Sequence, residues 1–193
     1  MNFSQQLQEA KSGLKNVSSV VRYPDGRSFV EKDGHNIQVE STFGYVVDTK
    51  PDDIPSQITQ YIYLGSQDAS ELEVLSKFNI KHVLSLGVKP FSYDVVHKFV
   101  KCLDLPETNI IDVLQHQCLY FISNAIRLKE NVLVHCAAGV SRSASIVIGY
   151  LMLTEKLSYE DAFTIVKNKR PCIKPNCGFE KQLKSLELKE IYL

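Results

Sequence analysis

The amino-acid sequence predicts an α/β domain with a central, mainly parallel sheet flanked by helices, preceded by an N-terminal extension. From Gln57 onward, short apolar runs alternate with longer segments in which apolar residues recur at helical spacing. This alternation is typical of strand–helix–strand units that build a parallel sheet. Residues 1–57 lack it. We therefore expect a partly ordered or partner-binding extension over 1–57 and one domain over 58–193, a division that suits a chain of 193 residues.

Four apolar runs predict the strands of this sheet, over residues 61–64, 82–86, 100–105 and 131–135. Helices are expected between and after them, over about 68–78, 113–129, 142–156, 159–169 and 178–191. Ser66 or Asp68 can cap the first helix, and Ser158 is suited to cap the fourth because acidic residues follow it. Open α/β sheets bind ligands at the carboxyl ends of their strands, so we expect the functional site there.

The extension carries signals of a different kind. Leu7, Ala10, Leu14 and Val17 recur at helical spacing and predict a short amphipathic helix. Turn sequences at 23–26 and 33–34 separate short β-prone pieces, which is typical of hairpins. Residues 50–56 contain two prolines and resemble a linker. The extension can pack on the domain, dock a partner or stay mobile, and the sequence leaves these three open.

Composition excludes several classes of function. The 22 basic residues balance 22 acidic ones, so no net charge attracts nucleic acid or an anionic membrane. No apolar run approaches membrane-spanning length, and the first residues lack the apolar centre of a signal peptide. The five cysteines show no framework spacing, and His116 and Cys118 are too isolated to predict a metal site. We expect a cytoplasmic protein with access to the nucleus, without metal or cofactor, and without nucleic-acid or membrane partners.

The segment 135–143 follows the predicted strand 131–135 and carries the strongest functional signal. Cys136 and Arg142 lie six positions apart, where the start of a helix leaves backbone N–H groups unpaired. Those groups can turn inward around a phosphate dianion, while Arg142 holds two of its oxygens and the positive field favours a thiolate at Cys136. Gly139 supplies the freedom that so tight a curl requires. The sequence predicts a phosphate-binding loop with a nucleophile beneath the phosphorus, lined by Ala137, Ala138, Gly139, Val140, Ser141 and Arg142.

A second catalytic group is needed, because a thiolate that attacks a phosphate ester expels an alkoxide or phenoxide that requires a proton. Asp104 is the best candidate, since it lies at the carboxyl end of the predicted strand 100–105 and beside Pro106. Glu107 and Asp112 are rivals, although Asp112 is placed to begin a helix. The residues alone leave open whether Asp104 is a general acid or an ordinary loop carboxylate.

Two further features permit more than one interpretation. Lys167, Lys169 and Arg170 can complement the dipole of a helix C-terminus or attract an anionic substrate, and the first interpretation is the simpler one. Cys102 can be an ordinary buried cysteine, which is the simpler interpretation again, or it can trap an oxidised Cys136 as a disulfide.

The pattern His135-Cys136-x5-Arg142-Ser143, with Asp104 32 positions before Cys136, resembles the cysteine-dependent dual-specificity protein phosphatases. Supporting similarity covers residues 58–187, including the stretches 63–66, 150–152 and 174–183. The resemblance implies a cysteine-phosphatase-like fold and metal-independent hydrolysis of phosphotyrosine, phosphoserine and phosphothreonine. It also implies phosphorylated protein substrates, among them components of stress-activated MAP kinase cascades.

The resemblance also implies roles for individual residues. Cys136 attacks phosphorus, Asp104 protonates the leaving oxygen, and Arg142 follows the phosphoryl oxygens through both transition states. Asp104 then acts as a base toward water, which releases phosphate from the phospho-cysteine. Three residues take supporting roles. Ser143 bonds to the departing sulfur, His135 orders the loop, and Asn176 braces the loop from behind.

Alternatives to a protein phosphatase fit less well. Phosphatases of inositol phospholipids carry lysines within the loop, where positions 137, 138 and 140 are here Ala, Ala and Val. An RNA 5′-phosphatase requires a broad basic track, which the sequence lacks. Sulfur transfer of the rhodanese kind has no need of Asp104. A scaffold that binds phosphoproteins without turnover stays open as a different class, although relatives of that kind lose the Cys, the Arg or the acid, and this chain keeps all three.

Overall fold

The computed structural model describes residue 52, residues 54–88 and residues 95–186, together with the backbone of three strands near the N-terminus. The chain divides into two compact units, Met1–Ser41 and Thr42–Leu193. In the first unit, an antiparallel sheet forms as the turn sequences predict, from β1 (Ser19–Arg22), β2 (Ser28–Lys32) and β3 (His35–Val39). The amphipathic helix predicted over residues 7–17 lies outside the described residues.

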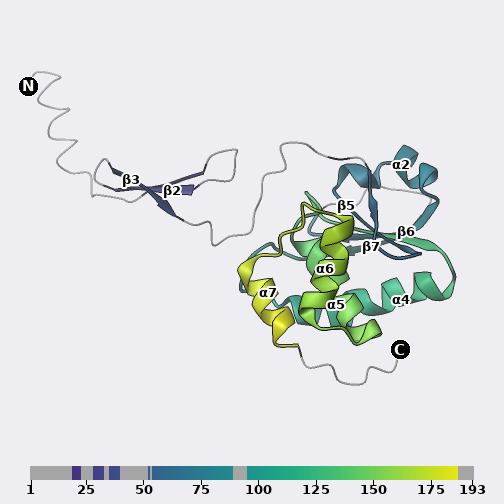
Figure 1. The fold of residues 1–193 in the computed structure, drawn as a ribbon. Coiled ribbons are helices and arrows are strands. Elements are labelled where there is room, and N and C mark those ends of the chain that lie inside the picture. Colours follow the sequence, from purple (N-terminus) through teal and green to yellow (C-terminus); the bar gives the residue numbers. More distant parts are fainter. Residues whose placement is uncertain are drawn as a thin grey trace, which may run out of the picture. The chain divides into compact units, whose positions relative to one another are not determined.

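The second unit is built on a five-stranded sheet with the strand order β4-β5-β8-β6-β7 (Figure 1). Its strands are β4 (Ser56–Gln57), β5 (Ile62–Gly65), β6 (Ile80–Leu86), β7 (Val96–Val100) and β8 (Asn131–His135). Strands β5, β8, β6 and β7 are parallel to one another, which confirms the mainly parallel sheet. The antiparallel edge strand β4 comes from residues assigned above to the extension, so this sheet begins upstream of residue 58.

Alternate residues of the central strands face opposite sides of the sheet, as strand geometry requires. Val132 and Val134 of β8 pack into the larger core, whereas Leu133 between them packs into a smaller core with Leu75 of α2 (Leu72–Lys77). Figure 1 shows α2 on one side of the sheet and the remaining long helices on the other. These are α4 (Leu119–Arg127), α5 (Arg142–Glu155), α6 (Tyr159–Lys169) and α7 (Cys177–Lys184).

The predicted third strand and the predicted last helix have wrong boundaries. The third strand is β7, at 96–100 rather than 100–105, because β7 is an edge strand with mostly half-exposed or exposed residues and so lacks the apolar run of a buried strand. Residues 101–109, called the Asp104 loop below, follow it without regular structure. The last helix, predicted over 178–191, ends at Lys184; residues 185 and 186 are not helical, and 187–191 lie outside the described residues.

Helix starts follow local capping chemistry. Ser158 caps α6 as predicted, because its hydroxyl accepts a hydrogen bond from the Asp161 amide at 3.1 Å. The helix predicted over 113–129 starts earlier, with Asn109 as its cap, and runs through α3 (Ile110–Asp112) and the π-helical η2 (Val113–Cys118) into α4. The helix predicted over 68–78 is divided into the 3-10 turn η1 (Asp68–Ser70) and α2. Over residues 54–88 and 95–186, no helix is long and apolar enough to cross a membrane.

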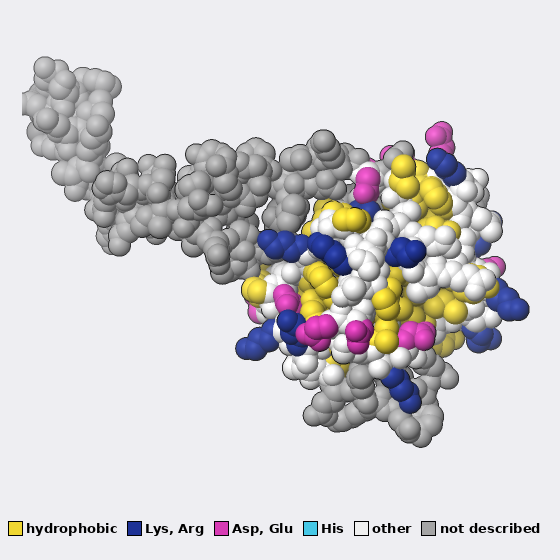
Figure 2. Space-filling view, in the orientation of Figure 1, with side chains coloured by type: hydrophobic (Ala, Val, Ile, Leu, Met, Phe, Trp, Pro, Cys, Tyr) yellow, Lys and Arg dark blue, Asp and Glu magenta, His cyan; other side chains and the backbone are white. Residues whose placement is uncertain are grey.

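The face formed by α6 and α7 carries mixed charges. Figure 2 shows basic and acidic side chains interspersed with hydrophobic ones on this side of the described residues. Lys184 of α7, for example, lies 2.8 Å from Glu180 and 3.9 Å from Glu160 of α6. This face therefore offers no continuous basic track of the kind that follows a nucleic-acid backbone.

Candidate active site

The loop of residues 136–142, called the phosphate loop below, joins β8 to α5 at the carboxyl end of the central strand. Each carbonyl oxygen from residue 137 to residue 141 accepts a hydrogen bond from outside the loop. The carbonyl of Ala137 accepts from the Gln67 amide (3.1 Å), that of Ala138 from Nη2 of Arg170 (3.2 Å), and that of Gly139 from Nε of Arg170 (2.9 Å). The carbonyl of Val140 accepts from the Lys174 amide (2.9 Å), and that of Ser141 accepts from the amide and the hydroxyl of Ser145 (2.8 Å each). A trans peptide is planar, so each C=O opposes the next N–H. The amides of 138–142 consequently face inward, as an anion cradle requires.

Gly139 is the turning point of the phosphate loop. Its φ of 67° is in the left-handed region, which glycine adopts without cost. A Cβ at this position would lie 2.6 Å from the carbonyl oxygen of Gly65 and 2.6 Å from Nη2 of Arg170. The loop therefore requires a residue without a side chain here.

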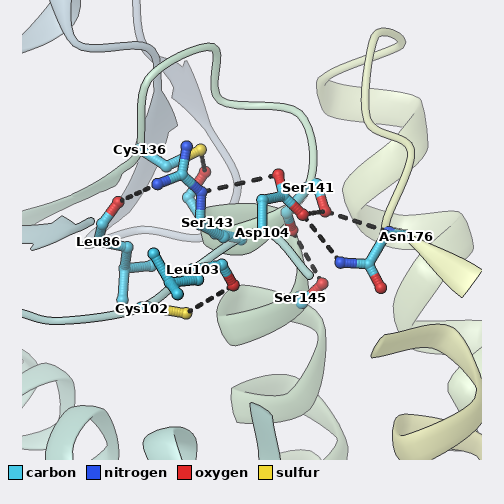
Figure 3. A network of polar contacts seen from close by, with 10 residues as sticks. Leu86, Cys102, Leu103, Asp104, Cys136, Ser141, Ser143, Ser145 and Asn176 are labelled. Atoms are coloured by element: carbon cyan, nitrogen blue, oxygen red, sulfur yellow. Dashed lines mark hydrogen bonds and ion pairs between the residues drawn. The ribbon is translucent and has the colours of Figure 1, made fainter. Parts of the chain in front are cut away.

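Cys136 lies at the base of the phosphate loop, with 2% of its surface exposed. Its Sγ is 3.2 Å from Oγ of Ser143 in the first turn of α5 (Figure 3). A hydroxyl in this position can donate a hydrogen bond to a sulfur that carries negative charge. The predicted pair is thus in direct contact in the structure.

Arg142 is buried beside the cysteine and anchored through one nitrogen. Its Nη1 donates to the carbonyl oxygen of Leu86 at 3.1 Å, and its Nε lies 3.6 Å from Oδ2 of Asp104. Nε has no hydrogen-bond acceptor among the described residues. Gly87, with a φ of 68°, makes room for the guanidinium, because a Cβ there would lie 2.3 Å from Nη1. The anchored fork is placed to bind phosphate oxygens.

Asp104 reaches the rim of the phosphate loop although it lies four residues beyond the end of β7. Its Oδ1 accepts hydrogen bonds from the Ser141 hydroxyl at 2.7 Å and from Nδ2 of Asn176 at 2.8 Å (Figure 3). The other oxygen, Oδ2, lies on the side of Arg142. The rivals Glu107 and Asp112 are exposed, and Asp112 lies within α3.

Asn176 joins the Asp104 loop to the phosphate loop. Its side-chain oxygen caps α7 by accepting from the Phe179 amide at 2.9 Å, which leaves Nδ2 free to donate to Asp104. Its backbone N–H donates to the Ser141 hydroxyl at 3.1 Å. The residue predicted to brace the phosphate loop from behind thus holds Ser141 and the candidate acid together.

Helix α7 holds the Asp104 loop at a second point. Nε2 of Gln182 donates to the carbonyl oxygens of Pro106 and Thr108 at 3.3 and 3.0 Å, and its Oε1 accepts from the Ile110 amide at 2.9 Å. Gly178 permits this close approach, since a Cβ there would lie 2.0 Å from the carbonyl oxygen of Pro106. The position of Asp104 therefore depends on α7.

Substituting Gly178→Ala should displace the Asp104 loop, because the new methyl group collides with backbone atoms that cannot rotate away. We expect kcat to fall by about tenfold on alkyl phosphates, which need a proton on the leaving oxygen, and by much less on activated aryl phosphates. Asp104→Asn should lower kcat with the same dependence on the leaving group but by a larger factor. Lys181→Ala, which changes an exposed residue of α7, should leave kcat unchanged on both substrates. An equal loss on both substrate classes would contradict this account.

His135 precedes the nucleophile and is part of a chain of polar groups that is buried at His135 and Ser85 and half-buried at His97. Its Nε2 lies 2.7 Å from Oγ of Ser85, which in turn lies 2.8 Å from Nε2 of His97 on β7. Burial lowers the pKa of His135 to about 4 and also lowers the pKa of His97. His135 is therefore neutral near pH 7 and orders the loop through hydrogen bonds rather than through charge.

The buried imidazole predicts a loss of stability in mild acid. An unfolded histidine has a pKa of about 6.5, so between pH 6.5 and pH 4 the unfolded chain binds a proton that folded His135 excludes. The free energy of unfolding should fall by about 3 kcal/mol across this window and be unaffected by His135 above it. Urea denaturation of the wild type and His135→Gln at several pH values measures this, since the variant should lose most of the slope. The exposed His116→Gln should keep the slope, and a His135→Gln slope equal to that of the wild type would refute the assignment.

Cys102 fits the interpretation of an ordinary buried cysteine. Burial raises the pKa of its thiol to about 11, so the group is protonated at neutral pH and is a poor attacking partner for an oxidised Cys136. Figure 3 shows its sulfur directed toward the carbonyl oxygen of Leu103, at 3.9 Å. Among the described residues, no three His, Cys, Asp or Glu side chains gather as a metal-ligand set.

Several residues at this site are not predicted from the sequence. Gln182 lies within a stretch that carries the family resemblance, but its contact with the Asp104 loop depends on the tertiary fold. Ser85 and His97 lie on strands and carry no motif. Lys167 and Lys169 lie in the last turn of α6, as the helix-dipole interpretation expects. Arg170 follows them but is 2% exposed and binds the phosphate loop, a role that the sequence does not predict.

A family model described as "Dual specificity phosphatase, catalytic domain" matches residues 62–189 of the chain. The chain belongs to the dual specificity phosphatase family. It is a metal-independent protein phosphatase of the dual-specificity type, and its solved relatives share its fold. The crystal structure of DUSP15 superposes with a TM-score of 0.64 at 32% identity, covering 69% of this chain and 86% of the other. The human tyrosine phosphatase-like serine/threonine/tyrosine-interacting protein also gives 0.64, at 34% identity, with 69% and 95% covered.

Relatives of this phosphatase come from animals and plants. Dual specificity protein phosphatase 19 of Mus musculus is 43% identical over 150 residues, 75% of this chain and 67% of the relative. Within the family, residues 65–69 and 103–110 of the sequence resemble this particular phosphatase, and the match confirms that resemblance. Dual specificity protein phosphatase 1 of Arabidopsis thaliana is 40% identical over 142 residues, 72% of this chain and 71% of the relative. Dual specificity protein phosphatase MPK-4 of Drosophila melanogaster is 39% identical over 132 residues, 64% of this chain and 33% of the relative.

Proposed function

We propose that this phosphatase hydrolyses phosphotyrosine, phosphoserine and phosphothreonine in proteins through a phospho-cysteine formed on Cys136. The proposal is carried by one observation, the convergence of a nucleophile, an anion cradle and a carboxyl group on the phosphate loop. Cys136 lies at the base of five inward-facing amides, the Arg142 fork lies beside them, and Asp104 lies at the rim. A phosphoryl group seated on these amides has the sulfur on one side and the carboxyl on the other.

The first chemical step transfers the phosphoryl group to sulfur. The Cys136 thiolate forms an S–P bond while the P–O bond to the tyrosine, serine or threonine oxygen breaks, and Oδ2 of Asp104 gives that oxygen its proton. Charge on the three equatorial oxygens is stabilised by the loop amides and by Arg142, which is the main source of rate acceleration in such sites. The dephosphorylated protein leaves, and the phospho-cysteine remains.

The second step returns the enzyme to its starting state. Asp104, now a carboxylate, takes a proton from a water molecule whose oxygen attacks phosphorus, and the S–P bond breaks to release inorganic phosphate. The Ser143 hydroxyl, 3.2 Å from the sulfur, donates to the departing thiolate. Asp104 thus acts as acid and then as base, as microscopic reversal of its proton transfer requires.

Phosphoproteins are the substrate class that the surroundings of the loop favour. Ala137, Ala138 and Val140 present no lysine to the additional phosphates of an inositol lipid. The likeness to a relative named MPK-4 supports substrates in MAP kinase signalling, which the family resemblance in the sequence also implies. With such substrates, we expect the enzyme to act in the cytoplasm, with access to the nucleus.

The test is release of inorganic phosphate from a peptide panel by the purified full chain in EDTA. The panel contains activation-loop peptides phosphorylated on threonine, on tyrosine and on both, beside scrambled peptides and soluble inositol phosphates. We expect turnover of phosphotyrosine and phosphothreonine and little turnover of inositol phosphates. We also expect rapid acid quenching to trap a phosphoenzyme on Cys136.

Two outcomes would change the assignment. Preferential turnover of inositol phosphates would overturn the protein-substrate class. No turnover of any substrate, with phosphate or vanadate still bound, would favour a phosphoprotein-binding scaffold, a class suggested by the "phosphatase-like" and "interacting" words in the name of one structural neighbour.

A further inference from the structure

A buried arginine links the segment upstream of the catalytic domain to the phosphate loop. Arg170, at the C-terminal end of α6, is 2% exposed, and its Nη1 and Nη2 form a two-pronged ion pair with the carboxylate of Asp52 at 2.9 and 3.1 Å. Asp52 lies ten residues before the start of the family match at residue 62. Its backbone is held as well, because its carbonyl oxygen accepts from the Ser66 hydroxyl at 2.7 Å. The contact therefore joins residues outside the family's matched region to its active site.

The same guanidinium holds two of the five carbonyl oxygens of the phosphate loop. Nη2 donates to Ala138 at 3.2 Å and Nε donates to Gly139 at 2.9 Å. These bonds orient the peptide planes whose opposite ends are the amides of Gly139 and Val140, so those two amides face the phosphate site. Other donors hold the remaining carbonyls. Arg170 is the described side chain that orients two adjacent planes at the centre of the loop.

Asp52 is the anionic partner of this guanidinium. A cation as buried as Arg170 needs a hydrogen-bonded anionic partner, because a buried charge without one is strongly unfavourable. Among the described residues, Asp52 is the carboxylate paired with it. Nη1 of Arg170 donates to the carboxylate alone, Nε donates to the loop alone, and Nη2 donates to both. Without the carboxylate, the guanidinium would be drawn toward water and away from the loop carbonyls.

We propose that Asp52 is a positioning residue for catalysis, which acts through Arg170 to aim the amides of Gly139 and Val140 at the phosphoryl oxygens. The inference rests on the phosphate-loop chemistry proposed above and extends the catalytic unit to a residue before β4. Because those amides bind charge that grows in the transition state, their misalignment should lower kcat more than it weakens substrate binding.

The experiment compares full-length Asp52→Ala, Asp52→Asn and Asp52→Glu with the wild type on an aryl phosphate. We expect Asp52→Ala and Asp52→Asn to lower kcat by about tenfold with KM changed by less than about threefold, since a displaced donor costs less than a deleted one. The inhibition constant of orthovanadate, which mimics the pentavalent transition state, should rise in parallel with the loss of kcat. Asp52→Glu keeps the charge and should recover much of the rate. Glu160→Ala, which removes an exposed carboxylate from an ion pair on α6, is the matched control and should be unchanged.

Each of three possible outcomes leads to a definite conclusion. If Asp52→Ala and Asp52→Asn lower only the melting temperature and keep the wild-type kcat and vanadate inhibition, Asp52 is structural and the proposal is wrong. If Asp52→Ala does not fold, Asp52→Asn, which keeps the shape of the side chain, decides alone. If the wild type itself has no turnover, the proposed function fails instead, and calorimetry of orthovanadate binding to the same variants decides the role of Asp52. Equal vanadate affinity across them would then refute it.

Discussion

Cys136→Ser is expected to lower kcat/KM for aryl phosphates and phosphopeptides by about 10⁴-fold or more. The hydroxyl that replaces the thiol does not ionise near neutral pH, and removal of a nucleophile eliminates the covalent route altogether. The shape of the phosphate loop should persist, because its carbonyls are held by groups other than the cysteine. The variant should therefore still bind inorganic phosphate and phosphopeptides, as calorimetry can measure.

The matched control for this variant is Cys172→Ser, the same chemical change at an exposed position. We expect it to keep wild-type rates. Retention of more than about a tenth of the wild-type activity by Cys136→Ser would show that the nucleophile lies elsewhere, and loss of phosphate binding together with activity would indicate a collapsed loop rather than a missing nucleophile.

Arg142→Lys is expected to reduce kcat by about 10³-fold while the fold is kept. A lysine retains the positive charge but offers no planar fork, so it cannot hold two phosphoryl oxygens and donate to Leu86 O in the same geometry. The arginine is expected to bind most strongly in the transition state, where oxygen charge is greatest, and arginines with this role contribute about 10³ to 10⁵ in rate. Steady-state kinetics on an aryl phosphate, with orthovanadate inhibition beside it, measures the loss.

A conservative exchange at an arginine outside the site tests whether any Arg→Lys change lowers kcat. Arg127→Lys alters an arginine on α4 that donates to Asn124, at an exposed site, and should leave kcat unchanged. If Arg142→Lys raised KM without lowering kcat, the arginine would serve substrate binding alone, and the transition-state role assigned to it would be wrong.

The parts of the site that are contiguous in sequence are predictable from it. The strand expected over 131–135 is β8 with the same bounds, and the helix expected from residue 142 is α5. A strand, a tight loop and a helix start follow one another within about a dozen residues, and each has a local signal: apolar residues, a glycine, then helical periodicity. The nucleophile and the arginine fork are part of this segment, so the chemistry can be recognised before the fold is known.

The choice of the acid is a matter of tertiary structure. Asp104, Glu107 and Asp112 are close in sequence and similar in chemistry, and the predicted strand that favoured Asp104 is misplaced, since β7 ends at residue 100. Asp104 reaches the site because α7, 72 residues further along the chain, contributes Asn176 and the clamp formed by Gln182. An edge strand with exposed residues and a clamp between distant elements leave no periodic signal in the sequence.

The sequence by itself determined the fold class, the family and the identity of the nucleophile and its arginine, because each depends on neighbouring residues and on local periodicity. The tertiary structure alone decided how the loop is held. Asp52 and Arg170 are 118 positions apart, and an aspartate in a proline-rich lead-in and an arginine at a helix end look like ordinary surface charges until the fold buries the guanidinium. Burial of the guanidinium makes it depend on this partner, and burial is a property of the packed chain rather than of any segment within it.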